Sequence, residues 1–218
     1  METLPVKILT LRMIPNLSAG LAKALGVDEK YRAIGLISTD SDDVTYMALD
    51  EATKVANVEV VYARSLYAGA ANASTALAGE VIGVLAGPTP AEVASGLRGA
   101  EAFLESGVGF RTANTMGDVV YLAHCVSRTG SYLSKLAQIP VGQALAYLIA
   151  PPVEAVVGLD AALKASDVDL VQFFAPPTET NFSGGLLTGT QSACQAACDA
   201  FAQAVREMAA KPKDLGGM

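Results

Sequence analysis

One stretch of this sequence occurs twice at a constant offset. Residues 49–61 (LDEATKVANVEVV) match residues 159–171 (LDAALKASDVDLV), with leucine, aspartate, alanine, lysine and valine recurring in place. Each copy predicts an amphipathic helix that ends at a polar pair and leads into a short β-branched strand. A period this long indicates two duplicated domains rather than a solenoid of short repeats.

Segments on either side of this stretch extend the match, although the offset changes along the chain. The offset is slightly longer where 21–23 match 133–135 and 36–37 match 148–149, and it is shorter where 79–84 match 185–190. Periodicity predicts strands over 6–14, 33–38, 58–63, 80–86, 119–127, 144–150, 168–171 and 185–190, and helices over 17–25, 42–55, 88–104, 129–136, from 152, and over 192–209. Asp42 suits the N-cap of its helix, and Gly26 suits a helix stop. We therefore predict an α/β (α+β) chain of two tandem domains, residues 1–110 and 111–218.

The composition leaves a choice between a membrane protein and a soluble subunit that buries surface against its neighbours. Hydrophobic residues make up 51% of the chain and charged residues 17%. The longest charge-free runs, 136–153 and 181–198, are interrupted by proline and glutamine or are rich in glycine, serine and threonine. Neither is a run of about 20 apolar residues that could span a bilayer. We expect no membrane partner and favour an oligomer.

Charge and cysteine content narrow the choice of partner and compartment. The net charge is −7 and the sequence contains no basic cluster, which argues against a nucleic-acid partner. The first residues do not read as a signal peptide, and three cysteines suit a reducing cytoplasm. Cys194 and Cys198 share a helix face and are expected in the core. His124 and Cys125 form at most a weak metal pair, so we predict no metal site.

An enzyme is not favoured by any motif in the sequence. The chain lacks the phosphate-binding and dinucleotide-binding glycine motifs and the serine-nucleophile elbow, and it contains a single histidine. The acidic run at 40–43 is weak evidence for a magnesium site, because carboxylates are also common where a helix starts. We predict no catalytic residue and no required cofactor.

Six longer segments resemble the tandem-domain shell proteins of bacterial microcompartments, and in particular the L-type subunits of ethanolamine-utilisation compartments. They are LISTDSDDVTYMALDEATK (36–54), VVYARSLYAGA (60–70), AGEVIGVLAGPTPAE (78–92), CVSRTGSYLSK (125–135), AYLIAPPVEA (146–155) and FFAPPTETNFSGGLLTG (173–189). The resemblance implies two circularly permuted shell-type domains, each a small, mainly antiparallel sheet with flanking helices. It also implies a cytoplasmic homotrimer that imitates a hexagon and tiles with other shell proteins around ethanolamine-degrading enzymes.

Pores are a further implication of the resemblance. Two loops, 67–79 and 174–184, would meet at the three-fold axis and gate a central pore, and passage of a cofactor as large as cobalamin is an open question. The pore-loop residues would be Tyr67, Gly69, Asn72, Gly79, Pro177, Glu179, Asn181 and Gly184. A smaller pore in each subunit would bind ethanolamine.

Acidic residues of one copy stand where the other copy is apolar, and this difference suggests a binding site. Asp42 and Asp43 lie opposite Pro152 and Val153, and the shorter offset sets Glu80 opposite a leucine. Carboxylates beside an aromatic ring suit a small ammonium ligand. The resemblance implies as ethanolamine contacts Asp43, Glu80, Phe110 and Thr180, with Asp42, Phe182 and Ser183 as additional candidates.

Two other interpretations stay open at this point. Asp42 and Asp43 are also ordinary helix-start residues, which need no ligand. The rival function is a soluble two-repeat sensor that binds a small amine and does not assemble into a shell.

Overall fold

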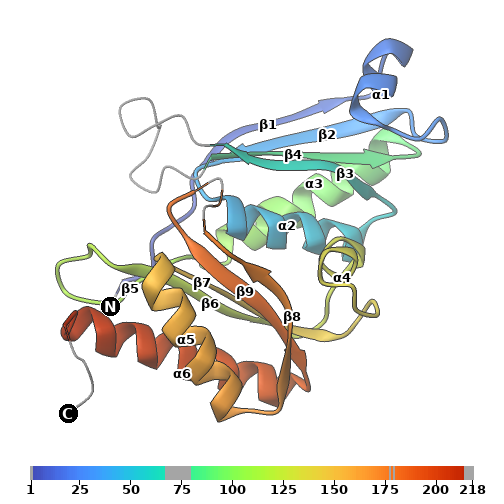
Figure 1. The fold of residues 1–218 in the computed structure, drawn as a ribbon. Helices are drawn as coiled ribbons and strands as arrows, with labels where there is room; N and C mark the ends of the chain where they lie inside the picture. The colour runs from blue at the N-terminus through green and yellow to red at the C-terminus, as the bar shows by residue number, and fades with distance from the viewer. Residues whose placement is uncertain (1, 67–79, 177, 179, 214–218) are drawn as a thin grey trace. The chain divides into compact units, whose positions relative to one another are not determined.

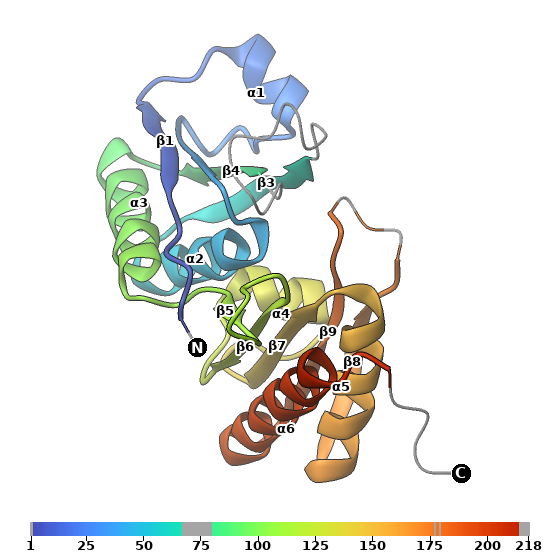
Figure 2. The ribbon, with the colours of Figure 1, turned by 90° about the vertical axis from the view of Figure 1, so that its left-hand side faces the viewer.

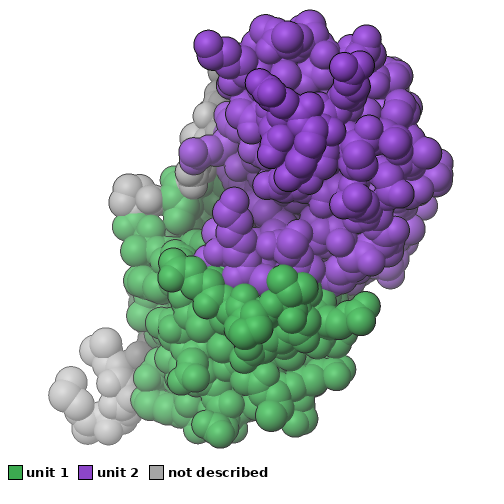
Figure 3. All heavy atoms as spheres, turned by 90° about the vertical axis from the view of Figure 1, so that its right-hand side faces the viewer, with its two compact units in different colours: residues 1–4, 109–129, 137–218 green, residues 5–108, 130–136 purple. Residues whose placement is uncertain are grey.

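A computed structural model of the chain describes residues 2–66, 80–176, 178 and 180–213. These residues belong to two compact units, coloured separately in Figure 3: unit 2 comprises residues 5–108 and 130–136, and unit 1 comprises residues 1–4, 109–129 and 137–218. The units follow packing rather than sequence order, and the repeat boundary at residue 110 stays a prediction.

Unit 2 is built on an antiparallel sheet with the strand order β1-β2-β4-β3. Its elements are β1 (Ile8–Ile14), α1 (Ala19–Leu25), β2 (Ala33–Thr39), α2 (Asp42–Val55), β3 (Glu59–Leu66), β4 (Glu80–Gly87), α3 (Pro90–Glu105) and α4 (Ser131–Ala137). Figures 1 and 2 show α2 and α3 on one face of this sheet and α1 near the ends of β1 and β2. Helix α2 buries Val44, Met47 and Leu49, and the expected helix stop at Gly26 is left-handed with φ 68°.

Unit 1 repeats the four-stranded order and the two long helices, with one additional short strand and, among its described residues, without a short helix of its own. Its sheet has the order β5-β6-β7-β9-β8, and its elements are β5 (Arg111–Thr112), β6 (Val120–Val126), β7 (Ala144–Ala150), α5 (Pro152–Ala165), β8 (Val168–Phe174), β9 (Ser183–Gly189) and α6 (Gln191–Ala210). Leu148, Leu159 and Phe201 belong to its core, together with Cys194 and Cys198, so the expected core role of the two cysteines is confirmed. Residues 2–4 pair with the chain around β5.

The two sheets share their order and one detailed irregularity. In both, every pairing is antiparallel. The third strand of each repeat shifts register at matching positions of the duplicated stretch, between Val60 and Tyr62 and again between Leu170 and Gln172. Each bulge bends its strand at the same place, as a duplicated fold requires. The predicted α/β class with two antiparallel sheets is confirmed.

Strand register corrects part of the sequence alignment. Val84 pairs with Tyr62, and Leu186 pairs with Gln172, so the counterpart of Leu186 is Val84 rather than Glu80. Glu80 therefore stands opposite Phe182 and not opposite a leucine. The error arose because the connection before β9 is shorter than the one before β4, and unequal loops leave no signal that fixes the gap. The match of 36–37 with 148–149 is also off by one position.

Two assignments of single residues were wrong as well. The N-cap of α2 is Ser41 rather than Asp42, which is the first helical residue. Gly184 was expected in a loop but lies within β9, where a Cβ would come 2.0 Å from the carbonyl oxygen of Leu148. Only glycine allows β7 and β9 to approach so closely there. Among the described residues, no helix combines the length and apolarity needed to cross a membrane.

Candidate functional site

Acidic residues gather in unit 2 where β2 gives way to α2. Asp40, Asp42 and Asp43 are all buried there. Val81 of β4 pairs with Thr39 on one side and with Ser65 on the other, and Glu80 is the next residue at the same end of the sheet. The register thus brings Glu80 to the sheet end from which Asp42 and Asp43 start their helix.

Asp42 is held by hydroxyl and amide donors. Its Oδ1 accepts a hydrogen bond of 2.9 Å from the backbone N–H of Asp43, and its carboxylate also accepts from the Ser65 hydroxyl. The Ser65 Oγ lies 2.5 Å from the Tyr46 hydroxyl. Burial raises the pKa of Asp42 above its ordinary value, and burial likewise raises the pKa of Tyr46 to about 12. The carboxylate is therefore desolvated without a protein cation beside it in the described part of the chain.

The Ser41 hydroxyl at the same place is unsatisfied within the described part of the chain. Ser41 is buried, and its Oγ has no hydrogen-bond partner among the described residues. The Ser41 backbone is nevertheless fixed, because its N–H donates to Thr39 Oγ1 and its carbonyl accepts from the hydroxyl of Thr45. A buried hydroxyl without a partner is uncommon, and a bound polar molecule is one way to satisfy it.

In unit 1 the structure brings together the aromatic candidates. The rings of Phe110 and Phe182 lie 5.1 Å apart between centroids, and Phe110 is buried. Thr180 lies in the turn just before Phe182, and its Oγ1 accepts a hydrogen bond from the Phe182 N–H. The Ser183 hydroxyl donates to the Phe174 carbonyl at 2.7 Å. The Ser183 hydroxyl therefore joins the two strands.

The predicted pore loops are only partly described. Asn181 is exposed between β8 and β9, whereas Gly184 is buried in β9. The remaining pore-loop candidates lie outside the described residues: Tyr67, Gly69, Asn72, Gly79, Pro177 and Glu179.

The weak metal pair lies elsewhere in unit 1. His124 and Cys125 line a cavity of about 380 Å³ on the α6 side of β6, together with Arg111, Tyr121 and Arg206. Within the described residues, no group of three histidine, cysteine or carboxylate side chains is placed to hold a metal ion. Burial raises the pKa of the Cys125 thiol.

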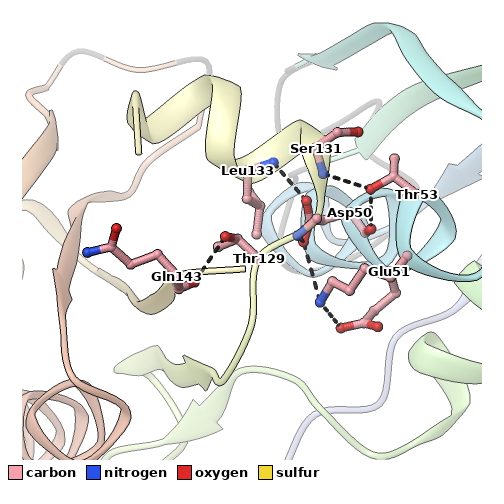
Figure 4. Close-up of polar contacts among 9 residues, drawn as sticks. Asp50, Glu51, Thr53, Thr129, Ser131, Leu133 and Gln143 are labelled. Atoms are coloured by element: carbon pink, nitrogen blue, oxygen red, sulfur yellow. Dashed lines mark hydrogen bonds and ion pairs between the residues drawn. The ribbon is translucent and has the colours of Figure 1, made fainter. Parts of the chain in front are cut away.

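Sequence reasoning missed the role of Asp50 in the middle of α2. Its side chain is fully buried, with Oδ2 accepting from the Gly130 N–H at 2.6 Å and Oδ1 from the Leu133 N–H at 2.8 Å (Figure 4). Thr53 Oγ1 accepts from the Ser131 N–H at 3.0 Å. One aspartate therefore holds the first turn of α4. The recurrence of aspartate in both copies was a signal that Asp50 has a role in the fold. Its partners lie far along the chain, so the sequence did not reveal what that role is.

Comparison with known proteins agrees with this fold. A family model described as the BMC domain matches residues 33–115. The bacterial microcompartment shell protein EutL of Clostridium perfringens is 63% identical over 205 residues, which are 94% of each protein. The crystal structure of the ethanolamine utilization protein EutL from Leptotrichia buccalis matches with a TM-score of 0.93 and 59% identity over 98% of both chains. A trimeric shell protein, PduB, shares the fold with a TM-score of 0.76 at 20% identity, covering 94% of this chain and 89% of that one.

Two repeats of one antiparallel α/β unit, with the BMC domain matched over residues 33–115, and the similarity to EutL along nearly the whole chain define a microcompartment shell protein. By its identity and coverage, the chain belongs to the EutL family of these shell proteins. Its role is structural rather than catalytic, and its predicted place in the shell of a microcompartment is confirmed by these relatives.

Proposed function

We propose that three copies of the chain close into a ring that serves as a tile of the ethanolamine-utilisation shell and admits small molecules. Two repeats of one design in each chain would give three copies six similar wedges, the number needed for a hexagonal outline. The PduB shell protein, which shares the fold, is trimeric, and this supports a ring of three here. The ring would meet other shell proteins at its edges.

We also propose that the chain binds ethanolamine, which is a cation at neutral pH. The observation that carries this proposal is the buried Asp42 carboxylate, which has no cation beside it in the described chain and lies near the unpartnered Ser41 hydroxyl. An ammonium group would offset the cost of burying a carboxylate. Asp43 and Glu80 belong to the same end of the unit 2 sheet, and their carboxylates would also attract the ammonium group of the ligand.

The remaining contacts are assigned to unit 1. Phe110 would offer a ring to the ligand, and Thr180 would meet its hydroxyl end. Phe182 packs on Phe110 and supports that ring. Ser183 is less suited to ligand contact, because its hydroxyl is already bound to the backbone.

Isothermal titration of the purified protein with ethanolamine tests the binding site. Asp43→Asn and Glu80→Gln should each weaken the affinity about tenfold, since each removes a charge without changing shape. Phe110→Leu and Thr180→Val test the unit 1 contacts separately. Asp169→Asn is the matched control, because Asp169 is an exposed acid on β8. Unchanged affinity in both acidic variants would remove the site.

Electron microscopy separates a shell tile from the rival amine sensor. Sheets or hexagonal arrays of the expressed protein are expected of a tile, whereas a sensor would stay dispersed. The gated central pore and the passage of cobalamin depend on loops that lie wholly or partly outside the described residues, and both stay predictions that flux through reconstituted sheets would test.

A further inference from the structure

Two short helices occupy equivalent positions in the repeats. Helix α1 (Ala19–Leu25) and helix α4 (Ser131–Ala137) each follow the first long strand of their repeat, and they have the same length. Helices α2 and α5 are equivalent in the same way, since they contain the duplicated stretch and also match in length. A contact made by α4 on α2 therefore has a counterpart in which α1 would meet α5.

The contact of α4 on α2 is visible within unit 2. Leu133 of α4 is fully buried, and its backbone N–H donates to Asp50. The rings of Tyr132 and Tyr46 lie 6.2 Å apart between centroids. The second repeat thus contributes a helix that covers the second helix of the first repeat.

The two surfaces that would form the equivalent contact, one on α1 and one on α5, are both exposed in the single chain. Leu21 stands in the position of Leu133 but is 43% exposed, and α1 has no buried residue. Asp160 stands in the position of Asp50, and its side chain is 62% exposed where that of Asp50 is 0% exposed.

The surroundings of Asp160 are apolar as well as open. Val156 is 51% exposed and Leu163 is 37% exposed, at the positions of Tyr46 and Thr53. A helix face of this kind is expected to be covered in the assembled protein. The exposed Leu21 on a second copy supplies a matching apolar group.

We propose that α1 of one copy packs on α5 of the next, with Leu21 in the role of Leu133 and Asp160 accepting a hydrogen bond from the Leu21 N–H. This interface rests on the proposed ring, and it names the surfaces that close it. Each copy would use α1 in the contact with one neighbour and the exposed face of α5 in the contact with the other. The contact is therefore head-to-tail and repeats until the ring closes.

The proposed α1–α5 contact differs from the α4–α2 contact at several positions. Ser18 replaces Gly130, where a Cβ would come 2.6 Å from the Asp50 carbonyl oxygen, so α1 must dock slightly further out at that end. Gly20 and Val156 replace the pair of tyrosines, and both are smaller, which leaves room for this shift. Lys164 pairs with Asp160 at 2.6 Å, as Lys54 does with Asp50 at 3.4 Å.

The first test measures the mass of the intact protein by gel filtration with light scattering. Leu21→Glu should weaken association about tenfold or more, because it would bury an unpaired charge beside Asp160. Lys23→Glu is the matched control: it adds the same side chain further along α1, where the equivalent Lys135 of α4 is exposed. Equal loss of association in both variants would contradict the proposal.

The second test traps the contact and does not depend on disrupting it. A chain carrying Ala19→Cys and Leu163→Cys places one thiol on each surface, at the positions of Ser131 and Thr53. Oxidation should give disulfide-linked dimers and trimers on a non-reducing gel, whereas either single variant should stay monomeric on it.

The outcomes separate this interface from the proposed ring. A wild-type protein that is monomeric overturns the ring and the interface together. A wild-type trimer that survives Leu21→Glu and forms no disulfide in the double variant overturns the interface alone. Circular dichroism of Leu21→Glu confirms folding, which is expected because Leu21 lies outside the core.

Discussion

The carboxylate of Asp50 accepts a hydrogen bond of 2.8 Å from the backbone N–H of Leu133, a residue of the other repeat. The same carboxylate accepts a second bond of 2.6 Å from the Gly130 N–H. Burial raises the pKa of Asp50, although these two bonds act to lower it. A buried charge with such partners fixes where α4 can lie.

Replacement of this aspartate should therefore be costly. Asp50→Ala leaves two backbone N–H groups without their acceptor and removes one of the two carboxylates that pair with Lys54, and we expect it to lower the free energy of unfolding by about 3 kcal/mol. Denaturant unfolding measures this. Asp169→Ala, at an exposed position, should change it by no more than about 0.5 kcal/mol, and equal effects would refute the assigned role.

Replacement of Asp42 should instead increase the stability of the protein at neutral pH. Burial raises its pKa, so the folded state binds a proton more tightly than the unfolded state does. The contribution of Asp42 to folding stability is therefore highest at low pH. It is lost as the pH rises from the ordinary pKa of an aspartate through the raised pKa of Asp42. Asp42→Asn removes that penalty, at about 1.4 kcal/mol per unit of pKa shift. We expect a higher melting temperature at neutral pH; a lower one would show that Asp42 serves the fold.

Ethanolamine binding should depend on the same titration. As pH falls through the raised pKa of Asp42, the carboxyl becomes neutral and attracts an ammonium group less, so the affinity should fall. Titration calorimetry at a series of pH values from neutral downward would detect this, with release of protons on binding at the lower pH. A flat profile would mean that Asp42 does not contact the ligand.

Gly184 is expected to tolerate no side chain. Its Cβ would come 2.0 Å from a backbone oxygen of β7, and the strand cannot yield without breaking the ladder. Gly184→Ala should cost about 3 kcal/mol or prevent folding. Gly20→Ala is the control, because nothing lies within 4 Å of its Cβ, and it should be neutral or slightly stabilising. Thermal melts of the two variants decide the matter.

Local patterns were sufficient for most elements and for the duplication itself. The helical period predicted α2 to within one residue at its start and to its observed end at Val55, and Gly26 marked a stop that needs a left-handed residue. By contrast, β5 has two residues and is defined only by pairing with distant chain, so no periodicity could reveal it.

The site was less accessible from sequence than the fold. The acidic residues near Asp42 were predicted, but their neighbours Ser65 and Tyr46 were not, because these come from another strand and from one turn further along the helix. The alignment of β4 with β9 failed since unequal loops precede them. Such features depend on register and on contacts between distant residues, which single-sequence patterns do not carry.

The native mass of the wild-type protein in dilute solution tests the central claim most directly. A closed ring of two-repeat chains predicts one species of three times 22.4 kDa, stable on dilution. A monomer at high concentration, or an assembly with an even number of chains, would contradict it.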